Sequence, residues 1–227
     1  MRMRRKKNLD ERLAACGDLL YMPMEEDRDF RADCSATIDL EAWFGAKRPL
    51  HMEIGCGKGG FICELAEREP HISFLAVERS ANVMVEAVEQ AKERGLQNVR
   101  FLKCTAEYLL RYLPKESVER LYLNFSCPFP KKKYAVHRLT HPRFLEIYRQ
   151  LLATGAEIHQ KTDNQQLFEC SLAWLSQNGF AMKNISLDLH STECPDNIVT
   201  EYEKRFMELG QPIYRLEAYI NRKEGAK

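Results

Sequence analysis

From residue 49 onward, short apolar runs alternate with stretches in which apolar residues recur at helical spacing. The runs at 49–55, 72–78, 99–103 and 118–125 are each expected to form a strand, and a helical stretch follows each of them. Repeated strand and helix units predict an α/β fold with a mostly parallel, doubly wound sheet. The last run, 212–220, roughly alternates apolar and polar residues, which favours an antiparallel position for the final strand.

A chain of 227 residues, 44% of them hydrophobic, is long enough to bury one sizeable core. It has no run of about 18 apolar residues, and no apolar segment follows its basic N-terminus, so we expect a cytoplasmic protein with no membrane partner. We expect a basic N-terminal arm at 1–48, with one short helix, and a single domain at 49–227. The eight cysteines include no C-x-x-C pair, so no metal site is expected.

The net charge of +1 conceals two basic runs. One is RMRRKK at residues 2–7, and the other is KKK at residues 131–133, with Arg138 close behind it. Local basic patches attract polyanions more effectively than net charge does. The alternative for either run taken alone is a solvated face.

A glycine-rich loop, EIGCGKGG at residues 53–60, ends the first expected strand. Glycines let the backbone approach a ligand closely, and the helix that follows offers N–H groups. Gly55, Gly57 and Gly60 match G-x-G-x-x-G, the dinucleotide fingerprint. Glu53 argues against NAD, because a carboxylate repels a pyrophosphate but suits a ligand that carries an ammonium and a sulfonium group. The loop therefore favours S-adenosylmethionine over NAD.

Glu78 ends the second expected strand, roughly 20 residues beyond the glycines. An acidic side chain at this place accepts hydrogen bonds from the two ribose hydroxyls of either cofactor, so it does not discriminate between them. The alternative for Glu53 and Glu78 is a pair of surface carboxylates at strand ends.

The run YLNFSCPFPKKKY, residues 122–134, begins as an apolar strand, breaks at Asn124 into a small polar turn, and crosses two prolines into three lysines. A polar turn at the carboxyl edge of a parallel sheet is where such folds place a substrate. The lysines would then hold a nucleic-acid backbone without reading its sequence.

Six stretches carry a family resemblance: HMEIGCGKGGF, AVER, YLNFSCPFPKKK, HRLTHPRFL, IHQKTDN and TEYEKRFMELGQPIYRLE. They resemble the bacterial tRNA (guanine-N7)-methyltransferases and cover most of the chain from residue 49. The resemblance implies a seven-stranded, Rossmann-like class I fold that uses S-adenosylmethionine. It also implies transfer of the methyl group to N7 of a guanine in the variable loop of tRNA.

The resemblance and the basic run together give the expected site residues. Those expected to bind the cofactor are Glu53, Gly55, Gly57, Glu78, Thr105 and Cys127. Those expected to bind the substrate are Lys131, Asp163, Thr200, Glu201, Tyr202 and Glu203. Those expected to contact the RNA backbone are Lys132, Lys133 and Arg138.

The chain departs from the family pattern in and near its expected site. Cys127 stands where the family usually has a catalytic aspartate, Phe129 replaces a tryptophan, and Thr105 stands where an aspartate is usual near the adenine. Guanine N7 has a lone pair and no proton, so it attacks a methyl group without a general base. Cys127, at the expected catalytic position, therefore need not abolish activity.

Several alternatives remain open on the sequence alone. One is a tRNA-binding relative that lost catalysis when Cys127 replaced the aspartate. Another makes Cys127 a covalent nucleophile, which carbon methylation needs and N7 methylation does not. Asp163 either accepts from the N1 and N2 edge of guanine or caps the helix that follows it. The oligomeric state is open between monomer and homodimer.

Overall fold

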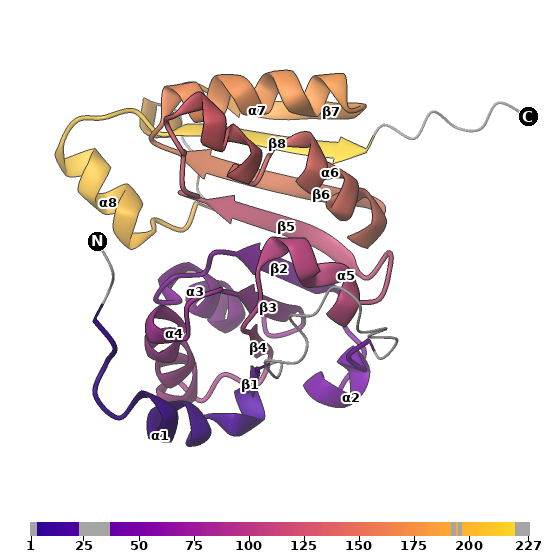
Figure 1. Cartoon of the computed structure of the whole chain (residues 1–227), viewed down its shortest axis with the longest axis vertical. Coiled ribbons are helices and arrows are strands. Elements are labelled where there is room, and N and C mark those ends of the chain that lie inside the picture. The colour runs from indigo at the N-terminus through magenta and orange to yellow at the C-terminus, as the bar shows by residue number, and fades with distance from the viewer. Residues whose placement is uncertain (1–3, 23–36, 192–193, 195–196, 221–227) are drawn as a thin grey trace, which may run out of the picture. The chain divides into compact units, whose positions relative to one another are not determined.

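The computed structural model describes residues 4–22, 37–191, 194 and 197–220. The chain divides into two compact units, Met1–Pro114 and Lys115–Lys227. In Figure 1 the colour runs along the chain, so the elements of the first unit are indigo to magenta and those of the second continue to yellow.

Four parallel strands form the sheet of the first unit, in the order β1-β4-β3-β2. These strands are β1 (Leu20–Tyr21), β2 (Leu50–Ile54), β3 (Ser73–Val77) and β4 (Val99–Leu102). The helices are α1 (Leu9–Ala14), α2 (Leu40–Phe44), α3 (Gly60–Arg68), α4 (Ala81–Glu93) and α5 (Leu109–Tyr112), with 3₁₀-helices η1 (Gly17–Leu19) and η3 (Ala106–Tyr108). Every residue of β2 and β3 is buried, as expected for parallel strands that are covered on both faces.

Helices α3 and α4 pack against each other and against these strands. Met84, Val88 and Ala91 of α4 recur at intervals of three or four residues and are fully buried, which places one face of the helix in the core. The helix ends before Gly95, whose φ of 66° supplies a left-handed residue beyond the last turn.

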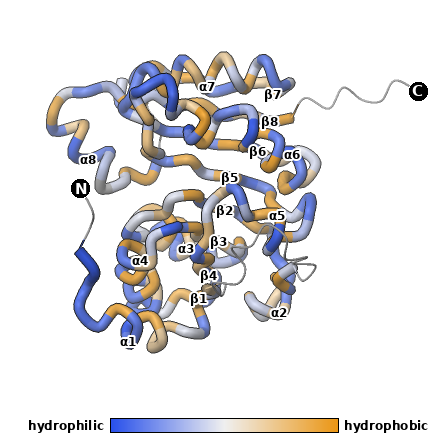
Figure 2. The backbone as a smooth tube through the Cα atoms, in the orientation of Figure 1, coloured by the Kyte–Doolittle hydropathy of each residue, from blue (hydrophilic) through white to orange (hydrophobic). Residues whose placement is uncertain are grey.

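The N-terminal segment is more regular than the arm expected from the sequence. Its described parts contain α1, η1, β1 and α2, and Leu9 and Leu13 of α1 pack on Val85 of α4. Asn82 at the start of α4 accepts from the Lys6 amide at 2.6 Å and donates to the Arg4 carbonyl at 2.9 Å. Figure 2 shows the stretch before α1 as hydrophilic. It is therefore held to the first unit by polar contacts such as these two hydrogen bonds.

The second unit combines one parallel pairing with two antiparallel ones, in the order β5-β6-β8-β7. Strands β5 (Val118–Asn124) and β6 (Leu152–Thr162) are parallel, whereas β8 (Tyr214–Ile220) runs antiparallel to both β6 and β7 (Phe180–Ser186). The helices are α6 (Pro142–Leu151), α7 (Gln165–Gln177) and α8 (Glu201–Glu208), with 3₁₀-helices η4 (Lys132–His137) and η5 (Leu189–Ser191).

Helix α7 packs on β6, β7 and β8, and Figure 1 shows it running alongside β7 and β8. Leu167 and Leu175 of this helix are fully buried, and Phe168 stacks on Tyr214 of β8 with ring centroids 5.2 Å apart. The opposite face of β6 carries Glu157, His159 and Lys161 in alternate positions. One sheet face therefore packs under α7, and the other carries these charged residues.

The seven strands expected from the sequence are all present, and the antiparallel position of the last one is confirmed. The described residues contain an eighth, the two-residue β1, which pairs with β4. The sequence did not reveal β1 because two residues carry no periodicity.

Within the described ranges, no helix combines the length and the apolar character needed to cross a membrane.

Candidate functional site

The glycine-rich loop of the first unit turns sharply between β2 and α3. Gly55, Gly57 and Gly59 have φ values of 84°, 59° and 85°, in the left-handed region. The amides of Gly55 and Cys56 both donate to the Val77 carbonyl, at 2.8 and 3.2 Å, which ties the loop to the end of β3. The expected Gly55 and Gly57 thus occupy positions where a side chain would strain the backbone.

Gly59 is a loop residue whose role sequence reasoning missed. A Cβ atom placed on it would lie 2.6 Å from the Cβ of Ala87 in α4. The start of α3 can approach α4 this closely only because residue 59 has no side chain. The four glycines of the loop were a signal, but only the packing distinguishes Gly59 from the others.

Two carboxylates flank this loop. Glu53 is the fourth residue of β2 and is 3% exposed, and Glu78 follows the last residue of β3. Ser80 N–H donates to Oε1 of Glu78 at 2.9 Å, which fixes that carboxylate. Burial raises the pKa of the Cys56 thiol, and the negative charges of Glu53 and Glu78 raise it further. The electrostatic effects of both carboxylates therefore reach the same loop residue, Cys56.

Thr105 follows the end of β4 and precedes η3. Its carbonyl accepts from the Cys104 thiol and from the Tyr108 amide, each at 3.0 Å. Because β2, β3 and β4 are parallel, their carboxyl ends bring the glycine-rich loop, Glu78 and Thr105 to one edge of the first unit. The structure thus brings together the expected cofactor residues of this unit.

The turn after β5 carries Cys127 in the second unit. The thiol-bearing residue is exposed, and it lies between two phenylalanines with positive φ, Phe125 at 48° and Phe129 at 42°. A bulky residue with positive φ is a strained exception. The residues 125–129, called here the substrate turn, therefore adopt a conformation that neighbouring contacts must hold.

Arg138 holds the substrate turn from inside the protein. It is 3% exposed, and its guanidinium donates from Nε to the Pro128 carbonyl at 2.8 Å and from Nη2 to the Phe129 carbonyl at 3.1 Å. Its third contact is Nη1 to Cys170 Sγ at 2.9 Å. The expectation that Arg138 contacts RNA is corrected, because the side chain is buried and donates to two backbone carbonyls of its own unit.

The lysine run lies at the surface. Lys131, Lys132 and Lys133 are all exposed, and η4 begins at the second of them. Lys133 Nζ lies 5.0 Å from the ring centroid of Tyr134, an exposed cation–π contact. Contact of these lysines with RNA stays a prediction.

Asp163 follows β6, and the structure resolves which residue caps the next helix. Asn164 is the N-cap of α7, where its Oδ1 accepts from the Leu167 amide at 2.8 Å. The capping alternative for Asp163 is thereby wrong. Its role in binding the substrate stays a prediction.

Thr200 and Glu203 form a capping box at the start of α8. The Thr200 hydroxyl accepts from the Glu203 amide at 3.0 Å. The Glu203 carboxylate is fully buried, where Oε2 lies 2.7 Å from Lys161 Nζ and Oε1 accepts from Asn197 Nδ2 at 2.6 Å. Direct binding of substrate by Glu203 is corrected, because its carboxylate is enclosed within the unit. Glu201 is the first helical residue, and its side chain lies outside the described part.

Tyr202, in the same block, is exposed, with 61% of its surface accessible. Its ring stacks on Phe125 of the substrate turn, with centroids 6.2 Å apart and planes 18° apart. Phe206, one helical turn later, stacks on the same Phe125 ring. Sequence reasoning missed Phe125, because nothing in an apolar residue after a strand indicates that it fixes a neighbouring helix.

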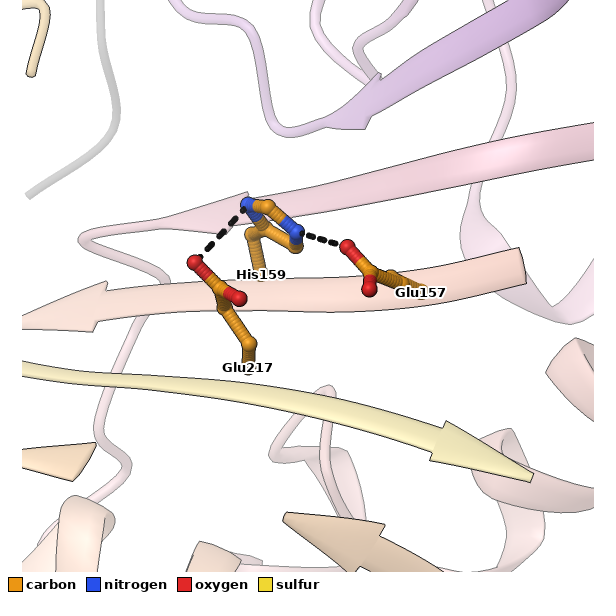
Figure 3. Close-up of side chains that lie close together, drawn as sticks. All are labelled: Glu157, His159 and Glu217. Atoms are coloured by element: carbon orange, nitrogen blue, oxygen red, sulfur yellow. Dashed lines mark hydrogen bonds and ion pairs between the residues drawn. The ribbon is translucent and has the colours of Figure 1, made fainter. Parts of the chain in front are cut away.

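A second polar cluster lies on the charged face of β6 and β8. Ligand-type atoms of Glu157, His159 and Glu217 lie within 4.8 Å of one another (Figure 3). The two ring nitrogens of His159 face different carboxylates, Nε2 at 2.8 Å from Glu157 and Nδ1 at 4.0 Å from Glu217. Lys183 pairs with both carboxylates, and Arg215 pairs with Glu217. Each carboxylate of the cluster therefore has a cationic partner in a network of ion pairs.

Comparison with solved structures identifies the fold. The chain superimposes on the 16S rRNA methyltransferase KamB with a TM-score of 0.61 and 15% identity, covering 82% of this chain and 94% of that one. It superimposes on the antibiotic-resistance methyltransferase Kmr with a TM-score of 0.56 and 22% identity, covering 80% and 91%. The fold is that of the class I methyltransferases.

Sequence comparisons give the family. A family profile described as "Putative methyltransferase" matches residues 47–216. The tRNA (guanine-N(7)-)-methyltransferase of Macrococcus caseolyticus is 44% identical over 86% of this chain and 96% of its own length. The enzyme of the same name from Bacillus subtilis is 40% identical over 96% and 98%. The chain belongs to the family of bacterial tRNA (guanine-N7)-methyltransferases.

Proposed function

We propose that the protein transfers a methyl group from S-adenosylmethionine to N7 of a guanine in the variable loop of tRNA. The observation that carries this proposal is the 40% identity to the B. subtilis enzyme along 98% of that enzyme's length. Because tRNA is modified in the cytoplasm, we propose that the protein works there.

The residues of the first unit fit S-adenosylmethionine. Glu53 is buried beside the glycine-rich loop and offers a carboxylate to the ammonium group. Glu78 has one oxygen engaged by Ser80, and its other oxygen would accept from a ribose hydroxyl. The left-handed glycines allow close backbone approach, and Thr105 stands at the same edge of the sheet. When bound, this cofactor supplies a methyl group on a positively charged sulfur.

The residues of the second unit would orient the guanine. N7 attacks with its own lone pair, so the chain has to supply alignment and to tolerate the positive charge that forms on the base. Asp163 would accept from the N1 and N2 edge, which selects guanine. The exposed Cys127 would shape the pocket without acting as a base or as a covalent nucleophile.

The exposed lysines 131–133 would hold the phosphate backbone of the RNA. Contacts of this kind supply affinity that falls steeply with salt, and they read no sequence.

The proposal is tested by incubating the purified protein with unmodified tRNA and methyl-labelled S-adenosylmethionine. We expect label in tRNA at a final stoichiometry near one. At limiting cofactor, the initial rate should be at least about tenfold lower for Glu53→Gln, which loses a charge-assisted contact worth about 1.5 to 3 kcal/mol. Binding of tRNA with no incorporation would contradict the proposal and would identify the protein as a catalytically impaired tRNA-binding relative.

A further inference from the structure

We propose that Arg138 is a positioning residue for methyl transfer, acting by holding the substrate turn in its strained conformation. The inference rests on the proposed function, since that function gives the turn its role. It assigns to Arg138 an internal task in place of an RNA contact.

The guanidinium of Arg138 grips two neighbouring residues of the substrate turn. Its Nε and Nη2 atoms donate to the carbonyls of consecutive residues, Pro128 at 2.8 Å and Phe129 at 3.1 Å. Pro128 has no amide hydrogen, so its carbonyl is the only backbone group through which hydrogen bonding can fix this residue. A planar fork of donors matches two adjacent carbonyls, whereas the ammonium of a lysine does not.

Arg138 is itself fixed to α7. Two residues further on, the Thr140 hydroxyl is 2.8 Å from that of Ser171, and both side chains are buried. The ring centroids of His141 and Trp174 lie 5.1 Å apart in a T-shaped arrangement, and Arg138 Nη1 contacts Cys170. The arginine thus connects the substrate turn to α7, whose N-cap Asn164 follows Asp163.

Arg138 opposes strain in the substrate turn. Phe125 and Phe129, at the two ends of the turn, both have positive φ, which their side chains disfavour. The contacts of Phe125 with Tyr202 and Phe206 hold the first end, and Arg138 holds the second. Without Arg138, the second end has no comparable hydrogen bond among the described contacts and would relax toward negative φ.

Relaxation of this end moves the residues around Cys127, which lies one residue before Pro128. A displacement of about 1 Å in a residue that positions a reacting group can lower a rate by about 100-fold. We therefore expect the loss of Arg138 to lower the rate at saturating substrate and to leave cofactor affinity unchanged.

Two readouts test the proposal on Arg138→Ala and Arg138→Lys. The first is amide hydrogen exchange, in which residues 124–131 should exchange at least about tenfold faster than in the wild type. The second is the single-turnover methylation rate with saturating tRNA and cofactor, which should fall about 100-fold in both variants. Guanidinium ion at low millimolar concentration should restore part of the Arg138→Ala rate and none of the Arg138→Lys rate.

Arg149→Ala is the matched control. Arg149 also donates from its guanidinium to a backbone carbonyl of the second unit, that of Asn178 at the end of α7. The Arg149→Ala variant loses the same kind of contact at a place away from the substrate turn. The amide exchange rates of its residues 124–131 and its methylation rate should therefore match those of the wild type.

The outcomes separate this inference from the proposed function. A wild-type protein that methylates no tRNA would refute the proposed function, and the exchange experiment would still decide whether Arg138 holds the turn. An Arg138→Ala variant with wild-type exchange and rate would overturn the inference alone. A variant with an unchanged rate but a shallower salt dependence of tRNA binding would show that Arg138 contacts phosphate instead.

Discussion

Lys161 at the end of β6 and Glu203 in the first turn of α8 form a buried ion pair, with Nζ 2.7 Å from Oε2. Lys161 is 7% exposed and Glu203 is 0% exposed. Lys161 Nζ also donates to the Ile198 carbonyl at 2.8 Å. The pair therefore fixes the block that carries Tyr202 next to the strand that leads to Asp163.

Glu203→Gln should destabilise the protein by about 3 to 5 kcal/mol, because it leaves the Lys161 charge buried without its counter-ion. Urea unfolding followed by circular dichroism measures this difference. Lys204→Ala, which removes the exposed neighbour on the same helix, should change the free energy of unfolding by less than about 0.5 kcal/mol. Equal stability of Glu203→Gln and the wild type would show that the pair contributes no net stabilisation.

The α/β fold could be predicted from the strand pattern, because burial on both faces of β2 and β3 leaves continuous apolar runs in the sequence. The glycine-rich loop, Glu78 and the substrate turn could be located too, since each follows directly on a strand. Arg138 and Glu203 were misassigned because a charge in a sequence does not show whether water or a buried partner surrounds it. Only the folded arrangement brings the Pro128 carbonyl to one of them and Lys161 to the other.

Glu86 of α4 links the glycine-rich loop to the N-terminal segment. Its Oε2 lies 3.5 Å from Lys58 of the glycine-rich loop, and its Oε1 pairs with Lys6. The hydrogen bond from Lys6 lowers the pKa of Glu86, and the charge of Lys58 adds to this effect. Lys6 of the N-terminal segment and Lys58 of the glycine-rich loop thus share one carboxylate.

Glu86→Gln should weaken binding of S-adenosylhomocysteine by no more than about fivefold, because exposed ion pairs contribute about 1 kcal/mol or less. Calorimetry measures the affinity. Glu89→Gln is the control, since Glu89 pairs with Arg12 and makes no described contact with the loop. If both variants lost the same affinity for S-adenosylhomocysteine, the effect would come from the charge of α4 in general, and Glu86 would have no specific link to the loop.

His159 should make stability depend on pH. Burial lowers its pKa below the ordinary 6.5, against the hydrogen bond to Glu157 and the charge of Glu217, which raise it. The nearby cations are Arg120, whose charge lowers this pKa, Lys183, which pairs with both carboxylates, and Arg215, which pairs with Glu217. Because the unfolded chain binds the proton more readily, this contribution is fully present above about pH 6.5 and is lost as pH falls below it.

The free energy of unfolding of the wild type should therefore decrease between pH 7 and pH 5, and His159→Gln should flatten that decrease. His141 also has a pKa lowered by burial, so part of the slope should persist in the variant. Denaturant titrations at half-unit pH intervals measure it. An identical slope in the variant would show that protonation of His159 is not linked to unfolding.

Substitutions of Cys127 test whether the reaction needs a covalent nucleophile or a general base. Cys127→Ser should keep most of the single-turnover rate, because N7 attack requires neither. Cys127→Asp should equal or exceed the wild type, since a carboxylate stabilises the positive charge that develops on the base. A serine variant that binds tRNA and S-adenosylhomocysteine but transfers no methyl group would refute the non-covalent mechanism.

Mass-spectrometric mapping of the methylated nucleotide tests the central claim most directly. The wild-type protein is incubated with unmodified tRNA and S-adenosylmethionine, and a tRNA whose variable-loop guanine is replaced by adenine serves as control. The account predicts 7-methylguanine at the variable-loop position of the first RNA and no product in the second. A different methylated base, or 7-methylguanine elsewhere in both RNAs, would contradict it.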